Sequence, residues 1–275
     1  MPSKIEQCRA VYREKKRILH LPANPTGLVF NIPRNLIYFN GPEEQELFVL
    51  GDTRDNERVI LLGRQSTRNW ISTVTHISGD GTFAASPSIF VQVYVILAER
   101  EDGFMFPIAH VLLPRKSQEI YIKMFSLLRD AFPQLLPESF SCDFEKGIPE
   151  DRARNVRERR ARYPPVEWKL FQRTLDQHSR SNNFNESNNK KLMKIVGTPH
   201  PHLWDFMLRV KTAYLSDYDN DFNDWVHGRG HRHRKRQAIN RDTRIRNQVH
   251  RYQQFLAGRL TAEEYLNGMV VALRG

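Results

Sequence analysis

The chain has 275 residues, of which 40% are hydrophobic and 27% charged, a composition typical of a globular protein. Its formal net charge of +11 favours a polyanionic partner, because each phosphate that Lys or Arg neutralises releases a counterion. The longest apolar run, IFVQVYVILA at 89–98, is about half as long as a membrane-spanning helix. We therefore expect nucleic acid as the partner and no membrane association. Two cysteines, Cys8 and Cys142, predict neither a disulfide framework nor a Cys-rich zinc site.

Residues 1–70 form a small mixed region in which short apolar pieces predict strands joined by turns. These pieces are GLVFNI, ELFVLG and RVILLGR.

Three strands and a helix are predicted between residues 71 and 145. The first strand, STVTHIS, ends at Gly79 and Asp80, and the second, FVQVYVILAE, is apolar on both faces and should be central. The third, FMFPIAHVLL, contains Pro107, which favours an edge position, and its short connection to the second predicts an antiparallel hairpin. A helix over 117–132 follows, which Ser117 caps and Pro133 ends.

A fourth strand, SFSCDF, completes this series and ends at Asp143. The helical crossover makes the first and fourth strands parallel neighbours. We therefore expect Asp80 and Asp143 to converge at one edge of the sheet. The alternative is that Asp80 is an ordinary turn residue before Gly81.

Basic and helical segments follow this region. The run IPEDRARNVRERRARY at 148–163 is an arginine-rich linker or exposed helix, and GRGHRHRKRQAINRDTRIR at 228–246 is a second basic run. The acidic stretch DYDNDFND at 217–224 is expected to be a solvated loop. The last segment predicts two helices around Gly258, the second opened by Thr261 and Glu264 in capping-box spacing.

One long segment resembles a known family. The residues from DGTF at 80–83 to FSLL at 125–128, with Lys116 and Tyr121 after the third strand and DFEKG after the fourth, are similar to the catalytic domain of Mutator-like element (MULE) transposases. Further on, YPPVEWKLFQRTLDQHSRSNNFNESNN resembles the stretch that carries the family's third acid, and it places Glu186 at that position. The likeness runs from about Trp70 to the C-terminus.

The resemblance implies an α/β fold, a ribonuclease H-like mixed sheet with flanking helices followed by a helical C-terminal region. It also implies that Asp80, Asp143 and Glu186 form a DDE triad, both catalytic and metal-binding. Such a triad binds Mg²⁺, with Mn²⁺ as a substitute, for the cleavage and strand transfer of DNA. On this basis we expect a transposase core over 71–196 and a helical basic region over 197–275.

The sequence departs from the family between the second and third acids, where a long helical insertion is missing and the core is shortened around 147–165. Two interpretations therefore stay open besides an active enzyme. One is a domesticated, non-catalytic DNA or chromatin interaction protein that has lost the active site. The other is a chain that lacks a piece between Gly147 and Arg162.

The basic runs supply the candidate residues for binding double-stranded DNA, with a solvated surface as the alternative. The cluster at 231–236 also resembles a nuclear import signal, so we expect a nuclear protein. Whether the protein is a homo-oligomer is left open. The candidate DNA-binding residues are Arg157, Arg159, Arg160, Arg232, Arg234, Lys235 and Arg236.

Overall fold

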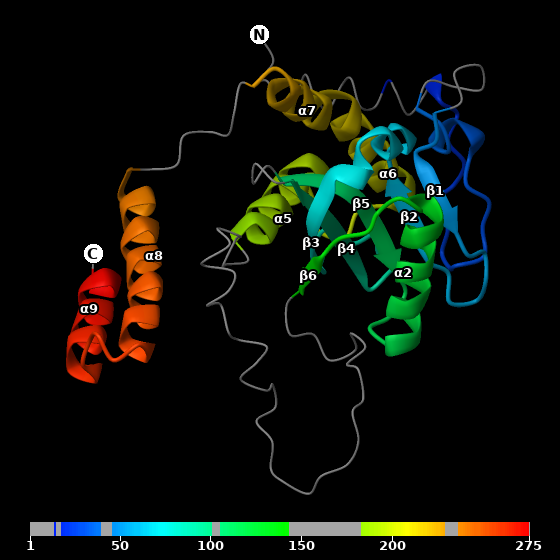
Figure 1. Ribbon diagram of the computed structural model, residues 1–275. Helices are drawn as coiled ribbons and strands as arrows, with labels where there is room; N and C mark the ends of the chain where they lie inside the picture. Colours follow the sequence, from blue (N-terminus) through cyan, green and yellow to red (C-terminus); the bar gives the residue numbers. More distant parts are fainter. Residues whose placement is uncertain are drawn as a thin grey trace, which may run out of the picture. The chain divides into compact units, whose positions relative to one another are not determined.

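The structure is a computed structural model that describes residues 14, 18–39, 46–100, 105–142, 183–228 and 236–274. The described residues fall into two compact units. The first contains every described strand together with α2, α5, α6 and α7, and the second contains α8 and α9 (Figure 1).

Most of the first unit is a mixed sheet with helices on both sides. Its strands are β1 (Val49–Asp52), β2 (Ile60–Gly63), β3 (Val74–Thr82), β4 (Gln92–Arg100), β5 (Met105–Leu113) and β6 (Ser139–Cys142). Its α-helices are α2 (Gln118–Ala131), α5 (Asn183–Val196), α6 (Leu203–Ala213) and α7 (Asp219–Val226). Short 3-10 turns cover Arg34–Leu36, Gln65–Asn69 and Ile71–Thr73. None of the described helices is both long and apolar enough to cross a bilayer.

The six strands follow the order β1-β2-β5-β4-β3-β6, so β4 is internal, as predicted. β4 pairs antiparallel with both β3 and β5, which confirms the predicted hairpin. β6 returns through α2 to lie parallel to β3, and Cys142 pairs with Gly79. The predicted order of strand, strand, strand, helix, strand is therefore confirmed, and the α/β class with it.

The predicted edge position of β5 is wrong, because β5 lies between β2 and β4. β2 pairs only with residues 109–112 of β5, so Pro107 lies beyond that pairing. On the β4 side, Ile96 pairs with Ala109 and Leu97 with Pro107, which leaves Ile108 as the extra residue of a bulge. A bulge tolerates a residue that lacks an N–H, so an internal strand accommodates this proline.

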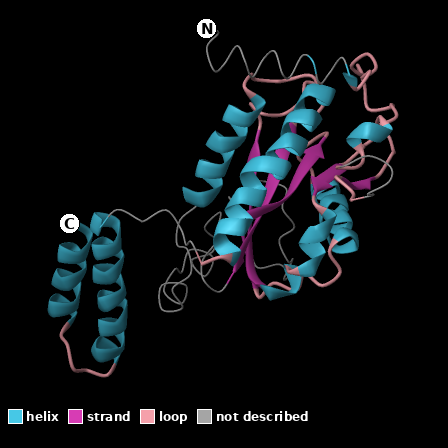
Figure 2. Cartoon of the chain, turned by 90° about the horizontal axis from the view of Figure 1, so that it is seen from above, coloured by secondary structure: helices cyan, strands magenta, loops and turns pink. Residues whose placement is uncertain are grey.

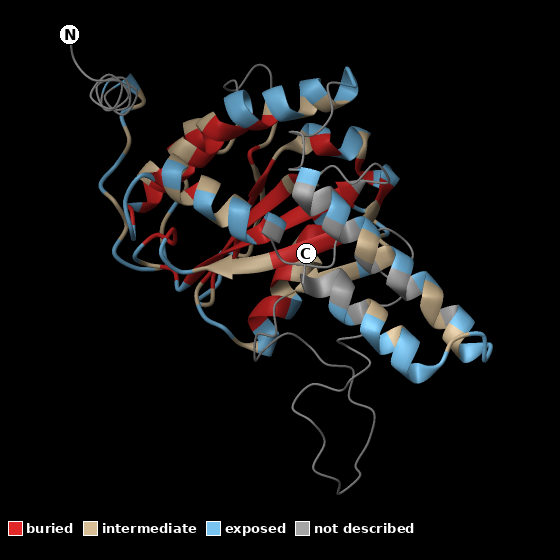
Figure 3. Ribbon diagram, turned by 90° about the vertical axis from the view of Figure 1, so that its left-hand side faces the viewer, coloured by how far each residue is buried: buried red, intermediate tan, exposed pale blue. Residues whose placement is uncertain are grey.

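Helices cover both faces of the sheet (Figure 2), and its strands are largely buried (Figure 3). Alternate residues of β2 and β4 enter two hydrophobic cores, one on each face. On β4, Val93 and Val95 pack with α5 and α6, whereas Tyr94 and Ile96 pack with α2. The same alternation on β2 places Leu61 on the α2 face. The near-continuous apolar run of β4 is thus explained by burial on both faces.

Helix α2 begins and ends where the sequence predicts. Ser117 occupies the N-cap position in extended conformation, although its side chain makes no capping hydrogen bond to the backbone, and Phe132 is the C-cap before Pro133. The apolar stripe of α2, including Ile120, Met124 and Leu128, is buried.

The acidic stretch at 217–224 is helical, so the predicted loop is wrong. Helix α6 continues into a π-helical turn over Tyr214–Tyr218 and then into α7. Tyr214 and Tyr218 are buried against the core, and this packing anchors a segment in which Asp217, Asp221 and Asp224 are exposed. Tertiary packing here outweighs the weak helix propensity of Asp and Asn.

Histidine 110 is buried on β5, with Nδ1 3.0 Å from the Tyr214 hydroxyl. Burial lowers the pKa of His110 to about 3, so the imidazole is neutral at pH 7. His110 is therefore a residue of the core.

Strands β1 and β2 belong to the same sheet as β3–β6, since β2 pairs with β5. The boundary expected at residue 70 therefore lies between strands of one sheet. Likewise, the range 197–275 contains α6 and α7 of the first unit and α8 and α9 of the second.

The second unit is a helical hairpin of α8 (Arg236–Leu256) and α9 (Ala262–Arg274). Gly258 in the connection has φ +68°, a conformation that glycine adopts without strain. The predicted capping box is present: the Thr261 N–H donates to Glu264 Oε2 at 2.8 Å, and the Glu264 N–H donates to Thr261 Oγ1 at 3.2 Å. The bonds that the Thr261 N–H and hydroxyl donate to the Glu264 carboxylate hold the pKa of Glu264 below its ordinary value.

Candidate functional site

The candidate site is built on the face of β3 that α5 covers. Ser78 and Asp80 both hydrogen-bond with side chains of α5, and Thr82 lines a depression beside that helix. The residues that alternate with them along β3 face the other side of the sheet: Ile77 belongs to the α2 core, and a Cβ on Gly79 would meet the ring of Tyr94. One strand thus contributes polar groups to one side and packing groups to the other.

Two asparagines of α5 meet this row of polar residues. The Ser78 hydroxyl donates to Asn185 Oδ1 at 3.0 Å, and Asn189 Nδ2 donates to Asp80 Oδ2 at 2.7 Å. Ser78 and Asn185 are buried, whereas Asp80 is half-buried. A carboxylate that accepts such a bond is held in one orientation, because rotation would break it.

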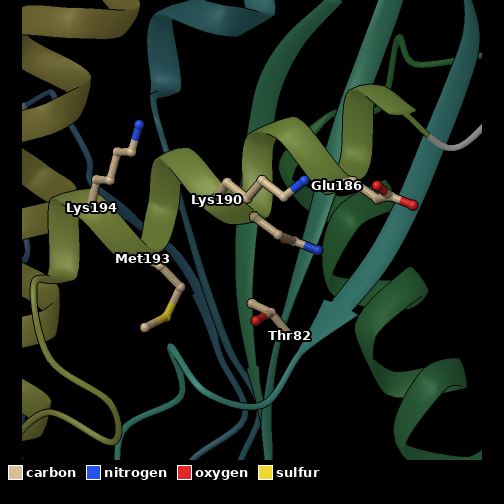
Figure 4. Close-up of a pocket in the computed structure, with 6 residues that line it drawn as sticks. Thr82, Glu186, Lys190, Met193 and Lys194 are labelled. Carbon is tan, nitrogen blue, oxygen red and sulfur yellow. The ribbon is translucent and has the colours of Figure 1, made fainter.

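An open depression of about 510 Å³ lies next to this contact, lined by Thr82, Glu186, Asn189, Lys190, Met193 and Lys194. In Figure 4 the carboxylate of Glu186 points toward β3, and the ammonium of Lys190 extends along α5 toward it. Met193 extends to the side of α5 on which Thr82 lies, and Lys194 points away from that residue. The depression therefore combines one carboxylate with two cationic side chains.

Of the three predicted acids, Asp80 and Glu186 lie on elements that pack together, since Asn189 binds Asp80 and lines the depression with Glu186. Asp143 lies outside the described residues. Cys142, which precedes Asp143 in the sequence, pairs with Gly79, which precedes Asp80. The strand pairing on which the predicted convergence depends is therefore present.

Among the predicted DNA-binding residues, only Arg236 belongs to the described part of the chain, where it begins α8 and is exposed. The other six, at 157, 159, 160, 232, 234 and 235, lie outside it.

The donor atoms partly fit a hard divalent cation. Asp80 and Glu186 provide carboxylate oxygens, the ligands that Mg²⁺ and Mn²⁺ prefer. Asn189 Oδ1 is a buried acceptor without a hydrogen-bond partner, beside the amide nitrogen that holds Asp80. The described residues contain no group of three or more His, Cys, Asp or Glu side chains placed to hold a metal ion. Two acids and one amide oxygen are thus what the described residues offer.

Other residues of the motif also contact one another. The Lys116 ammonium lies 3.9 Å from the centre of the Phe83 ring, a cation–π contact just beyond the end of β3. Gln92 Nε2 donates to the Tyr121 hydroxyl at 2.8 Å, which links the start of β4 to α2. Phe83 is 43% exposed, so this contact lies at the surface.

Asn185, Asn189, Lys190 and Lys194 were not among the site residues predicted from the sequence. Their signal was present in FNESNNKKLMK, where asparagines and lysines recur four positions apart and so share faces of one helix. Asparagine is not a favoured residue inside helices, so the composition of this stretch does not predict one.

Comparison with known proteins adds no relative: no family model, no curated protein and no solved structure matches the chain.

Proposed function

We propose that the first unit is a ribonuclease H-like transposase core of the MULE type, acting on double-stranded DNA in the nucleus. Its reaction would be metal-dependent cleavage and strand transfer at a phosphodiester. Asp80, Asp143 and Glu186 would be the catalytic and metal-binding acids.

The observation that carries this proposal is the alignment of β3 with β6 and α5. Three antiparallel strands, a crossover helix and a fourth strand parallel to the first are the arrangement that the resemblance requires. Asp80 lies on β3, an internal strand between β4 and β6, and α5 brings Glu186 to the same face of the sheet. Two acids that are distant in the sequence are thereby brought to neighbouring elements.

The residues of the depression suit a phosphodiester substrate. Lys190 and Lys194 lie one helical turn apart and line it together with Glu186. Ammonium groups at that spacing would hold DNA phosphates and offset the charge of the acids. A divalent cation, when bound by the carboxylates, would activate the attacking hydroxyl and stabilise the leaving oxygen.

Cleavage of supercoiled plasmid and of labelled duplex oligonucleotides with Mg²⁺ or Mn²⁺ tests the proposal. We expect nicking that Asp80→Asn, Asp143→Asn and Glu186→Gln each reduce at least about a hundredfold, since even outer-shell changes at metal sites cost about 10–100-fold. Asp130→Asn, an exposed acid on α2, is the matched control and should leave the rate unchanged. Nicking that survives all three substitutions, or no nicking by the native chain, would refute the catalytic proposal.

A second candidate function is non-catalytic binding of DNA or chromatin, which the composition of α8 favours. This helix carries five arginines and a single acid. Arg244 and Arg246 are half-buried and thus still partly accessible to solvent. Replacing Arg236, Arg244 and Arg251 by Gln should lower DNA affinity and reduce the slope of log K against log salt by about 0.9 per lost phosphate contact. If the acid variants change nothing and these variants abolish binding, the second function is the correct one.

A further inference from the structure

The two asparagines of α5 match β3 in spacing as well as in chemistry. Asn185 and Asn189 are four residues apart on a helix, a rise of about 6 Å. Their partners Ser78 and Asp80 are two residues apart on a strand, a rise of about 6.6 Å. Because both pairs increase in number together, α5 runs in the same direction as β3, and the two hydrogen bonds form in one register only.

Other registers of α5 on β3 are disfavoured. Ser78 is 6% exposed and Asn185 is 4% exposed, so a slip of α5 along β3 would bury both side chains without their present bonds. An unmade hydrogen bond of a buried polar group is costly. The apolar residues of α5 that enter the core, Leu192 and Val196, limit rotation of the helix but make no directional bond.

We propose that Asn185 and Asn189 are positioning residues that set the register of α5 on β3 and so hold Glu186 beside Asp80. Glu186 follows Asn185 directly and lies one turn before Asn189, so the two hydrogen bonds bracket it along the helix axis. In addition, Asn189 fixes the orientation of the Asp80 carboxylate, while its own Oδ1 remains as an acceptor for a ligand of the site. The catalytic role of the positioned acids rests on the proposed function, whereas the register of α5 on β3 does not depend on it.

The two hydrogen bonds also support the third acid, Glu186, because they join α5 to β3 on either side of it along the helix. The asparagines of α5 are then a requirement of the site.

Two measurements on the 275-residue chain test the register proposal. The first is hydrogen exchange of the α5 amides without metal: Asn185→Ala and Asn189→Ala should each accelerate it about tenfold, with α2 unchanged. The second is titration with Mn²⁺ alone, where both variants should bind about 10–100-fold more weakly. Ser187→Ala, an exposed neighbour on the same helix, is the matched control and should alter neither.

The outcomes separate the two proposals. Unchanged α5 exchange in both asparagine variants would overturn the register proposal, whatever the metal result. Faster exchange with native Mn²⁺ affinity would overturn the positioning of Asp80 and Glu186. If the native chain binds no Mn²⁺ and nicks no DNA, the proposed function fails, and accelerated exchange would still support the register.

Discussion

Glycine 79 separates Ser78 from Asp80, and its replacement by alanine tests how tightly β3 is held. A Cβ at this position would lie 2.5 Å from Cε1, 2.7 Å from the hydroxyl oxygen and 2.9 Å from Cζ of Tyr94. Ordinary contacts begin near 3.4 Å, so the ring or the strand would have to move by about 1 Å. Tyr94 is 1% exposed and packs edge-on against Tyr121 with ring centroids 5.7 Å apart, which leaves it little room.

Overpacking of this kind costs about 1–3 kcal/mol, and we expect Gly79→Ala to lower the free energy of unfolding by that amount. Urea denaturation followed by tryptophan fluorescence measures it. Gly27→Ala is the control, because nothing lies within 4 Å of its Cβ position, and it should change stability by less than about 0.5 kcal/mol.

A double-mutant cycle identifies the cause. If the clash with Tyr94 is responsible, Gly79→Ala combined with Tyr94→Leu should be less destabilised than the sum of the two single variants by at least about 1 kcal/mol. Strict additivity, or a Gly79→Ala variant as stable as the native chain, would refute the argument.

Three further predictions concern stability. Asp52→Asn should lower the free energy of unfolding in urea by about 3 kcal/mol, because it leaves the guanidinium of Arg58, 3% exposed and 2.6 Å from Asp52 Oδ2, without its charge partner. The control Asp55→Asn, at an exposed acid, should lower it by less than about 1 kcal/mol. Equal losses in the two variants would contradict the prediction. The pKa of His110 is lower in the folded chain than its value near 6.5 in the unfolded chain. Because the unfolded chain therefore binds more protons as the pH falls through 6.5, the contribution of His110 to the free energy of unfolding should drop by about 1.4 kcal/mol from pH 7.5 to 5.5. His110→Gln should reduce this loss of stability relative to the native chain. An identical pH profile of stability in the variant and the native chain would contradict the prediction. Thr261→Ala removes the capping box and should lower the helical circular dichroism signal, whereas the native signal in this variant would mean that α9 begins independently of its cap.

Much of the sheet could be predicted because its signals are local. The period of two in β3, the two-sided apolar run of β4 and the helical stripe of α2 each determine an element within a short window. The parallel pairing of β3 with β6 then follows from the helical crossover between them. The placement of Asp80 on the strand next to β6 could thus be reached from the sequence, although β3 continues to Thr82, beyond the predicted end at Asp80.

The predictions failed where contacts between residues distant in the sequence determine the local structure. Pro107 favours an edge strand by its missing N–H, but the bulge at Ile108 accommodates it inside the sheet. The acidic residues at 217–224 favour a loop, but burial of Tyr214 and Tyr218 makes the segment helical. The contact of Asn189 with Asp80 joins residues 109 positions apart, a separation over which no local pattern is informative.

The alternation along β3 has a consequence for any mutational survey of this strand. Selection for a folded chain alone should constrain positions 77 and 79, whose neighbours are the aromatic and aliphatic groups beneath α2, and position 78, whose buried hydroxyl bonds to α5. Position 80 should be less constrained by folding, because Asp80 is half-buried. Selection for activity should add its strongest new constraint at position 80, so a library randomised over these four codons would yield two profiles that differ mainly at that codon.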